Sequence, residues 1–365
     1  MNKNALWLTL LLVLISLIGV MTIYSSTINS PSQAERLIYL RQLSWVFLGF
    51  ICFLGISQVY YHRLWDLAYL FYALGVMFLL MVAFLGLSRL GAQRWLKILW
   101  FNFQPSELMK LIIIVFLARY YSKPGFSIRQ DVQNWGFTKA VLIPFAFVSL
   151  PMVLIMKQPD LGTAALIFLI FIAILLLARV NFKFIACVLL GIILATPLFW
   201  HFLKDYQKSR LMVFLNPNVD PLGSGYTIIQ SKIAIASGGL FGRGWLAGSQ
   251  SQLHFLPESH TDFIFASFAE EWGFLGSSVL FLLYYFLIIC VLNTARRAPD
   301  NFGRLLASGI ALSLVIQIFV NIAMTIGLAP VVGLPLPLLS YGGSSLMVVF
   351  LSLGILISIE KRLAA

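Results

Sequence analysis

Three ionisable residues, Glu258, His260 and Asp262, occupy alternate positions in the stretch LPESHTDFIFA, at the start of a long apolar run. Burial and neighbouring negative charge both raise the pKa of a carboxylic acid. An acid whose pKa lies closer to neutrality suits general-base catalysis. The alternative is that Asp262 only caps the helix that follows, because acids at a helix N-terminus accept hydrogen bonds from free N–H groups. The crowding by Glu258 and His260 favours the general base.

Similar steps from polar to apolar sequence occur at three other places. Glu107 and Lys110 lie in FQPSELMK, Asp160 lies in KQPDLGTA, and Ser340 lies in LPLLSYGGSS. Capping is the simpler interpretation for each of these acids taken alone, above all for Asp160, which follows Pro159. Lys110 follows Glu107 by three positions, so on a helix the two side chains can form an ion pair.

The chain that carries these residues is 60% hydrophobic and only 10% charged, with a mean hydropathy of +0.93. Such an apolar composition over 365 residues is typical of a multi-pass membrane protein. The formal net charge of +12 is scattered through short loops without any recognised basic module, so we expect no nucleic-acid partner. Anionic headgroups of the lipid bilayer and a phosphate-bearing substrate are the expected partners of the cations.

About twenty apolar residues span a bilayer. Ten apolar runs are candidates: residues 5–24, 42–58, 67–86, 107–121, 140–156, 161–178, 182–200, 263–292, 304–326 and 344–360. We therefore expect an all-α, polytopic integral membrane protein with about ten transmembrane helices. The eighth run is too long for one perpendicular crossing and carries Glu270 and Glu271. Its first turns should lie at the outer surface, or the helix should tilt.

The orientation follows from the Lys and Arg residues of the short loops, which concentrate on the cytoplasmic side of a membrane. Most of them fall on the side of the two chain ends, so both termini are predicted to be cytoplasmic. Even-numbered spans then all begin outside. This alternation places Glu107, Asp160, Asp262 and the turn of residues 340–345 on the same outer face of the membrane.

The segment of residues 201–262 is predicted to be one long extracytoplasmic loop. Its first part, residues 202–217, is amphipathic and sets Lys208 and Arg210 beside apolar residues, as expected of a helix lying in the membrane interface. Its glycine-rich part, residues 236–250, contains no nucleotide-binding motif. The glycines are expected to permit tight turns or the close approach of backbone to a ligand.

Four segments carry a resemblance to a known family: FQPSELMK, KQPDLGTA, HTDFIFASFAEEWGFLG and GLPLPLLSYGGSSL. They resemble the signatures of the SEDS family (shape, elongation, division and sporulation proteins), and the similarity runs from the first span to the last. The segments FLPESHTDFIFA and GLAPVVGLPLPLLSYGGSS are more similar to the elongation members than to the division members. The resemblance implies one transmembrane domain over residues 1–365.

The same resemblance implies a peptidoglycan glycosyltransferase in the bacterial cytoplasmic membrane. It would polymerise lipid II, a disaccharide-pentapeptide on undecaprenyl diphosphate, on the outer side. A class B penicillin-binding protein and other membrane proteins of the elongation complex are the implied partners. Asp262 matches the catalytic acid of the family. The implied substrate-site residues are Glu107, Lys110, Asp160, Arg210, Glu258, His260 and Ser340.

Such a reaction needs a base for the acceptor hydroxyl and positive charge for the departing diphosphate. Asp262 is the expected base. Lys110 and Arg210 are the candidates for the diphosphate, Arg210 because its planar fork can hold two oxygens. A divalent cation, Mg²⁺ or Mn²⁺, could assist the leaving group, although no ligand spacing in the sequence requires one.

Two other functions compete with the glycosyltransferase. A flippase or transporter of lipid-linked precursors would place polar groups near the middle of its spans. The first, second, third, sixth and seventh spans are instead nearly free of charge in their cores. A scaffold that only positions a penicillin-binding protein would leave the outer acids with no role beyond capping. The distribution of acids at one face favours chemistry at the membrane surface.

Overall fold

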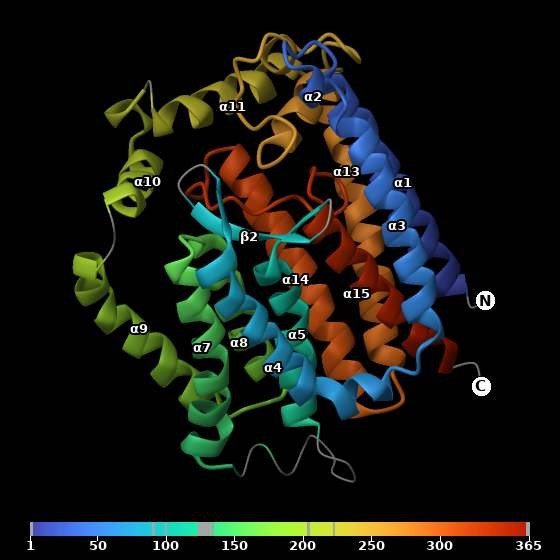
Figure 1. The fold of residues 1–365 in the computed structure, drawn as a ribbon, viewed down its shortest axis with the longest axis vertical. Helices are drawn as coiled ribbons and strands as arrows, with labels where there is room; N and C mark the ends of the chain where they lie inside the picture. Colours follow the sequence, from blue (N-terminus) through green and yellow to red (C-terminus); the bar gives the residue numbers. More distant parts are fainter. Residues whose placement is uncertain are drawn as a thin grey trace.

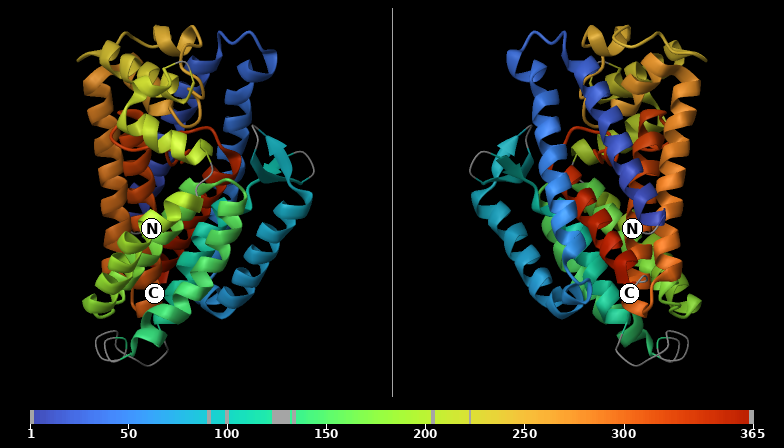
Figure 2. Two further views of the ribbon diagram at one scale, coloured as in Figure 1. Left: turned by 90° about the vertical axis from the view of Figure 1, so that its left-hand side faces the viewer. Right: turned by 90° about the vertical axis from the view of Figure 1, so that its right-hand side faces the viewer.

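The computed structural model is a helical bundle (Figures 1 and 2). It describes residues 3–89, 92–98, 101–122, 132, 135–202, 205–221 and 223–362. Lipid offers no hydrogen-bonding partners to the backbone, so a chain this apolar satisfies its N–H and C=O groups within helices.

Ten helices among the described residues correspond to the ten predicted spans. They are α1 (Lys3–Thr27), α3 (Ile38–Gln58), α4 (His62–Leu85), α5 (Pro105–Tyr121), α7 (Ile143–Lys157), α8 (Leu161–Leu177), α9 (Phe182–Phe202), α13 (Ile264–Arg297), α14 (Asn301–Thr325) and α15 (Gly343–Arg362). Within the described chain, seven helical stretches are long and apolar enough to cross a membrane, and two shorter apolar helices lie in α8 and α9. The prediction of an all-α, multi-pass membrane protein is confirmed.

A small sheet departs from the purely helical prediction. Strands β1 (Leu87–Arg89), β2 (Ala92–Ile98) and β3 (Phe101–Phe103) pair antiparallel in the order β1-β2-β3. The sheet follows α4 and precedes α5, at the side of the molecule in Figure 2. Strands β1 and β3 have only three residues each, and AQRWLKI in β2 does not alternate regularly between apolar and polar residues, so the sheet could not be predicted from sequence.

The segment of residues 201–262 contains further short helices. These are α10 (Asp205–Leu215), the 3-10 turn η2 (Pro217–Val219), α11 (Ser224–Gly238) and α12 (Ser249–Gln252). Helix α11 lies near α2 (Gln33–Arg36) at the top of Figure 1, which we call the outer end. The helix expected within residues 202–217 is present as α10.

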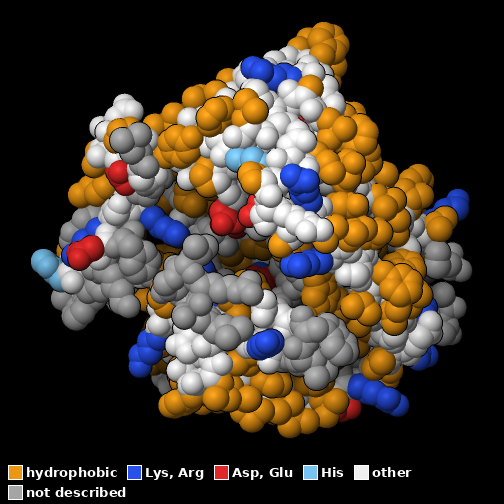
Figure 3. Space-filling model, turned by 45° about the horizontal axis from the view of Figure 1, so that its top comes forward, with side chains coloured by type: hydrophobic (Ala, Val, Ile, Leu, Met, Phe, Trp, Pro, Cys, Tyr) orange, Lys and Arg blue, Asp and Glu red, His pale blue; other side chains and the backbone are white. Residues whose placement is uncertain are grey.

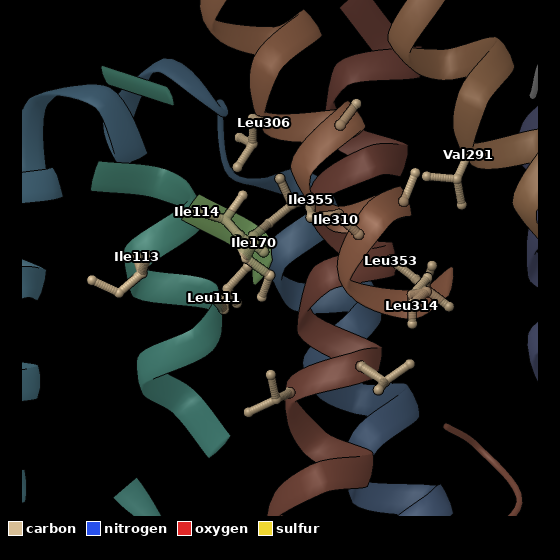
Figure 4. Close-up of a cluster of buried hydrophobic side chains, with 14 of the residues drawn as sticks. Leu111, Ile113, Ile114, Ile170, Val291, Leu306, Ile310, Leu314, Leu353 and Ile355 are labelled. Carbon is tan, nitrogen blue, oxygen red and sulfur yellow. The ribbon is translucent and has the colours of Figure 1, made fainter. Parts of the chain in front are cut away.

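The central helices pack closely because apolar side chains interdigitate around them. Figure 4 shows Ile114 of α5, Ile170 of α8, Ile310 of α14 and Leu353 of α15 in this core, all fully buried or nearly so. Helix α15 also packs tightly on α3. A Cβ added to Gly354 would lie 2.3 Å from a side-chain atom of Ile56.

The long helix α13 is kinked at Gly273, whose φ is +64°. The glycine-rich segment lies against the kink: Phe274 N donates to Gly239 O at 2.9 Å, and Leu275 N donates to Leu240 O at 3.1 Å. A Cβ on Gly273 would lie 2.2 Å from Gly242 N. The glycines therefore permit close approach of one backbone to another, and the kink separates the first turns of α13 from the rest of the helix.

The two acids of α13 lie just before this kink and have partners in the outer segments. Glu270 accepts hydrogen bonds from Gln250 N at 2.9 Å and from Ser249 Oγ at 3.1 Å, which holds α12 in place. Glu271 accepts a hydrogen bond from Ser25 Oγ at the end of α1. These acids stabilise the outer segment and lie away from the middle of the bundle.

Candidate active site

The four predicted outer helix starts meet at one end of the bundle. Gln104, which precedes α5, donates from Nε2 to Asp160 Oδ2 at 3.3 Å, and its backbone N donates to Ser344 Oγ of α15 at 3.0 Å. Ser340 Oγ, before α15, donates to Thr261 O at 2.7 Å. This chain of hydrogen bonds connects the starts of α8, α5, α15 and α13, so the prediction that these starts lie together at one end is confirmed.

Asp262 lies immediately before the first residues of α13 and does not cap this helix. The N-cap residue is Phe263, and no side chain accepts a cap hydrogen bond there. Within the described residues, the Asp262 carboxylate has no hydrogen-bonding partner, and the side chain is half-buried. The carboxylate is therefore available to a ligand, and the capping interpretation is wrong for this acid.

Burial raises the pKa of Asp262 from its ordinary value of 3.8 to about 6, and the negative charge of Glu258 adds to the rise. Arg210 and Arg94 oppose it, and Asp160 contributes a small further increase. The two causes are those that the sequence predicts. A carboxyl group of this pKa is mostly ionised at neutral pH yet binds a proton more readily than an exposed acid, which suits a general base.

The backbone around Asp262 is held in place because three consecutive carbonyl oxygens each accept a hydrogen bond. His260 O accepts from Tyr341 N at 2.9 Å, Thr261 O accepts from Ser340 Oγ at 2.7 Å, and Asp262 O accepts from Asn321 Nδ2 at 3.0 Å. The Ser340 hydroxyl also accepts from Leu336 N at 2.8 Å. Ser340 is buried and its hydroxyl joins two loops, so its contacts are with the protein itself.

Two arginines from distant segments act on the Asp262 carboxylate. Arg210 of α10 is exposed and donates from Nη1 to Val331 O at 3.1 Å. Arg94 of β2 donates from Nε to Gln158 O at 3.1 Å and also bonds to Pro159 O. Arg210 is a predicted site residue, whereas sequence reasoning missed Arg94. The available signal was its predicted position in an outer loop, on the same face as the acids.

Glu107 and Lys110 form a separate pair in the first turns of α5. Lys110 Nζ lies 2.9 Å from both carboxylate oxygens of Glu107, and both residues are buried. A cavity between α5, α14 and α15 adjoins them, and its polar lining includes Gln317 and Ser345. The predicted ion pair is confirmed. Neither residue is among the charged groups that shift the pKa of Asp262.

Asp160 is the N-cap of α8. Its Oδ1 accepts from Thr163 N at 3.2 Å, and its Oδ2 accepts from Thr163 Oγ1 at 3.0 Å and from Ser106 Oγ at 3.3 Å. Capping is therefore confirmed for this acid, which also ties α8 to the start of α5.

Glu258 and His260 have different surroundings. Glu258 is exposed, adopts a φ of +52° and accepts from Thr261 Oγ1 at 2.7 Å. His260 is half-buried with its ring 5.9 Å from that of Tyr341, and burial lowers its pKa, so it is neutral at pH 7. Acidic and basic side chains lie beside one another near the middle of the outer face (Figure 3).

The described residues contain no group of three or more His, Cys, Asp or Glu side chains that could hold a metal ion. Near Asp262 the acidic neighbours that act on it are Glu258 and Asp160, and Asp160 is engaged in capping. This donor set does not fit a dedicated metal site built by the protein alone.

A family model described as "Cell cycle protein", which covers FtsW, RodA and SpoVE, matches residues 4–364. The chain belongs to this family. It is 40% identical to the peptidoglycan glycosyltransferase MrdB of Escherichia coli (strain K12), over 99% of this chain and 96% of that protein. It is 34% identical to the peptidoglycan glycosyltransferase RodA of Treponema pallidum (strain Nichols), over 97% of both. The predicted resemblance is confirmed.

Solved structures of the family have the same fold. The rod shape determining protein RodA of Thermus thermophilus superposes with a TM-score of 0.71 and 26% identity, over 97% of this chain and 96% of that one. A chain from a peptidoglycan synthase complex that coordinates polymerization and crosslinking superposes with a TM-score of 0.79 and 28% identity. This superposition covers 98% of this chain and 97% of the chain from the complex.

Proposed function

We propose that this chain is a peptidoglycan glycosyltransferase that polymerises lipid II during cell elongation, with Asp262 as the general base. The activity of its named relatives supports the reaction class. The observation that carries the assignment of the base is the Asp262 carboxylate itself. It is uncapped and half-buried, and its pKa is about 6.

The reaction follows from the stereochemistry of the substrate. The donor sugar is joined to diphosphate in the α configuration and the polymer linkage is β, so one inverting displacement suffices. The acceptor hydroxyl oxygen bonds to the anomeric carbon while the bond from that carbon to the diphosphate oxygen breaks. Asp262 takes the hydroxyl proton, and undecaprenyl diphosphate leaves with the bonding electron pair.

Arg210 is the cation that we assign to the diphosphate, and Arg94 supports it. A guanidinium has five N–H donors, and the bond from Arg210 to Val331 O uses one of them. Lys110 is less suited than the sequence indicates, because both oxygens of Glu107 already contact its ammonium group. We assign the other predicted site residues to shaping the substrate site: Glu107, Lys110, Asp160, Glu258, His260 and Ser340.

No step of this mechanism is routed through Mg²⁺ or Mn²⁺, because the donor set around Asp262 does not fit a metal site of the protein alone. A divalent cation bound to the substrate diphosphate would be part of the substrate complex. The assay is therefore run with and without divalent cations.

We also propose that residues 1–365 form one domain in the bacterial cytoplasmic membrane, with both termini cytoplasmic and residues 201–262 outside. Asn4 of α1 donates to Glu360 of α15 at 2.7 Å, which supports placing both ends on one side. A class B penicillin-binding protein is the proposed partner, together with other membrane proteins of the elongation complex. The similarity to a chain of a peptidoglycan synthase complex supports this partner.

The test is polymerisation of lipid II by the purified protein in liposomes, with and without the class B partner. Wild type should produce glycan chains and Asp262→Asn should produce none. The matched control is Asp205→Asn, because Asp205 is an exposed acid of the same outer segment. It should retain wild-type activity.

Full polymerase activity of folded Asp262→Asn would contradict the assignment of the base and favour the scaffold. Absence of chains from wild type under every condition would contradict the polymerase, and a lipid-flipping assay would then test the transporter.

A further inference from the structure

Asn321 of α14 is fully buried and holds two segments with one amide group. Its Nδ2 donates to Asp262 O at 3.0 Å and to Leu334 O at 2.8 Å. An amide nitrogen carries two protons, so these two bonds use both of them. The residue that precedes Leu334, Gly333, lies beside the Asp262 side chain: a Cβ added there would be 3.4 Å from Asp262 Oδ2. The amide therefore links the two stretches of backbone that border the carboxylate.

The orientation of this amide is determined by its neighbours. Because both groups facing it are carbonyl oxygens, the nitrogen must point to them and the oxygen must point away. Among the described residues, Asn321 Oδ1 is buried without a hydrogen-bonding partner. An unpaired buried oxygen costs free energy. The benefit of an asparagine at this position thus lies in the two bonds that it donates.

We propose that Asn321 is a positioning residue for the Asp262 base. This inference rests on the proposed function. The backbone of residues 260 and 261 is already held by Tyr341 and Ser340. Asn321 adds a third anchor, at Asp262 itself. It also fixes the distance between Asp262 and the segment that contains Val331, whose carbonyl oxygen accepts a hydrogen bond from Arg210.

The consequence is that removal of the amide should slow the chemical step rather than weaken substrate binding. Displacement of a catalytic group by about 1 Å can reduce the rate roughly 100-fold. We expect Asn321→Leu, which is of similar size and has no donors, to lower kcat about 10- to 100-fold at a KM within about twofold of wild type.

A pH profile of kcat/KM distinguishes a positioning role of Asn321 from a smaller fraction of folded protein in the variant. The charged groups acting on Asp262 are Glu258, Arg210, Arg94 and Asp160. Without the Asn321 amide, the Asp262 carboxylate would change its distances to these charged groups and, with them, its pKa. The acid limb of kcat/KM should therefore move. A smaller active fraction would lower the rate and leave that limb in place.

The experiment measures lipid II polymerisation per folded molecule, over a range of pH, for the full chain with its class B partner. The matched control is Asn4→Leu, since Asn4 is also a buried amide with several partners, at the opposite end of the bundle. It should lower thermal stability and leave the pH profile unchanged. Asn321→Asp is the second variant: its buried carboxyl group would be protonated and keep one donor, so it should lose less kcat than Asn321→Leu.

Wild-type kcat and an unmoved acid limb in folded Asn321→Leu would overturn the proposal, as would failure of both Asn321 variants to fold. In the latter case the amide would serve stability only. Inactivity of wild type itself would instead contradict the proposed function, so the two failures are distinguishable.

Discussion

Replacement of Asp262 by Asn should make the folded protein more stable while it abolishes catalysis. Burial disfavours the charged form, so the folded protein binds the Asp262 proton more tightly than the unfolded chain does. Above pH 6 the ionised carboxylate therefore destabilises the fold. The destabilisation declines as the pH falls from about 6 to 3.8 and vanishes below that range, where the group is neutral in both states. The amide introduced by Asp262→Asn would be neutral at every pH.

The size of the effect follows from the two pKa values. One pH unit corresponds to about 1.4 kcal/mol, so the difference between 3.8 and about 6 amounts to at most roughly 3 kcal/mol near pH 7.5. Near pH 4 the ionised carboxylate lowers the free energy of unfolding by only about 0.5 kcal/mol. Asp262→Asn should thus gain stability at neutral pH and gain almost none in acid.

The assay is equilibrium unfolding of wild type and variant in mixed detergent micelles near pH 7.5 and near pH 4. The exposed acid Asp205 supplies the control, because Asp205→Asn should change stability little at either pH. Equal stability of wild type and Asp262→Asn near pH 7.5 would refute the reasoning, since it would mean that the ionised carboxylate is not disfavoured by the fold. A gain that is the same at both pH values would refute it too.

Three further predictions concern rate and stability. The kcat/KM of wild type should fall about tenfold per pH unit below pH 6, since Asp262 must be ionised to accept a proton; a rate that stays flat down to about pH 4.5 would contradict this. Gly273→Ala should destabilise the protein by about 1–3 kcal/mol or more in thermal unfolding, because of its φ of +64° and the contact with Gly242. The control Gly55→Ala, in a helix with no atom within 4 Å of the added Cβ, should be neutral or stabilising, and an equal loss in both would contradict the argument. Asp160→Ala should lower stability by about 1 kcal/mol through loss of the cap of α8, and an unchanged unfolding midpoint would show that the cap contributes nothing.

Much of the arrangement could be predicted from sequence because the membrane imposes a simple rule. A helix that crosses it needs about twenty apolar residues, and each crossing reverses the direction of the chain. The ten runs and their alternation were therefore sufficient to bring Asp160, Asp262 and Ser340 to one end of the bundle. The family signatures directed attention to Asp262 in the same way.

Which acid caps a helix could not be decided from local sequence, as two similar acids show. Asp160 and Asp262 both precede apolar helices, yet Asp160 caps its helix and Asp262 does not. Asp160 is the N-cap residue of α8 and accepts from Thr163 N, whereas Asp262 lies one residue before the N-cap of α13 and its backbone is held by the distant Asn321. Sequence alone also missed Arg94, because no local pattern marks an arginine that reaches across from a short strand.

The sequence by itself determined the membrane class, the order of the apolar spans and the meeting of the helix starts that carry ionisable residues at one end of the bundle. Hydropathy and alternation of spans are properties of consecutive residues, so they can be read along the chain. Only the tertiary structure decided which acid remains without a cap, which cations act on it and which amide holds it. Hydrogen bonds and charge interactions of this kind join residues from separate helices, and their partners exist only once the helices have packed.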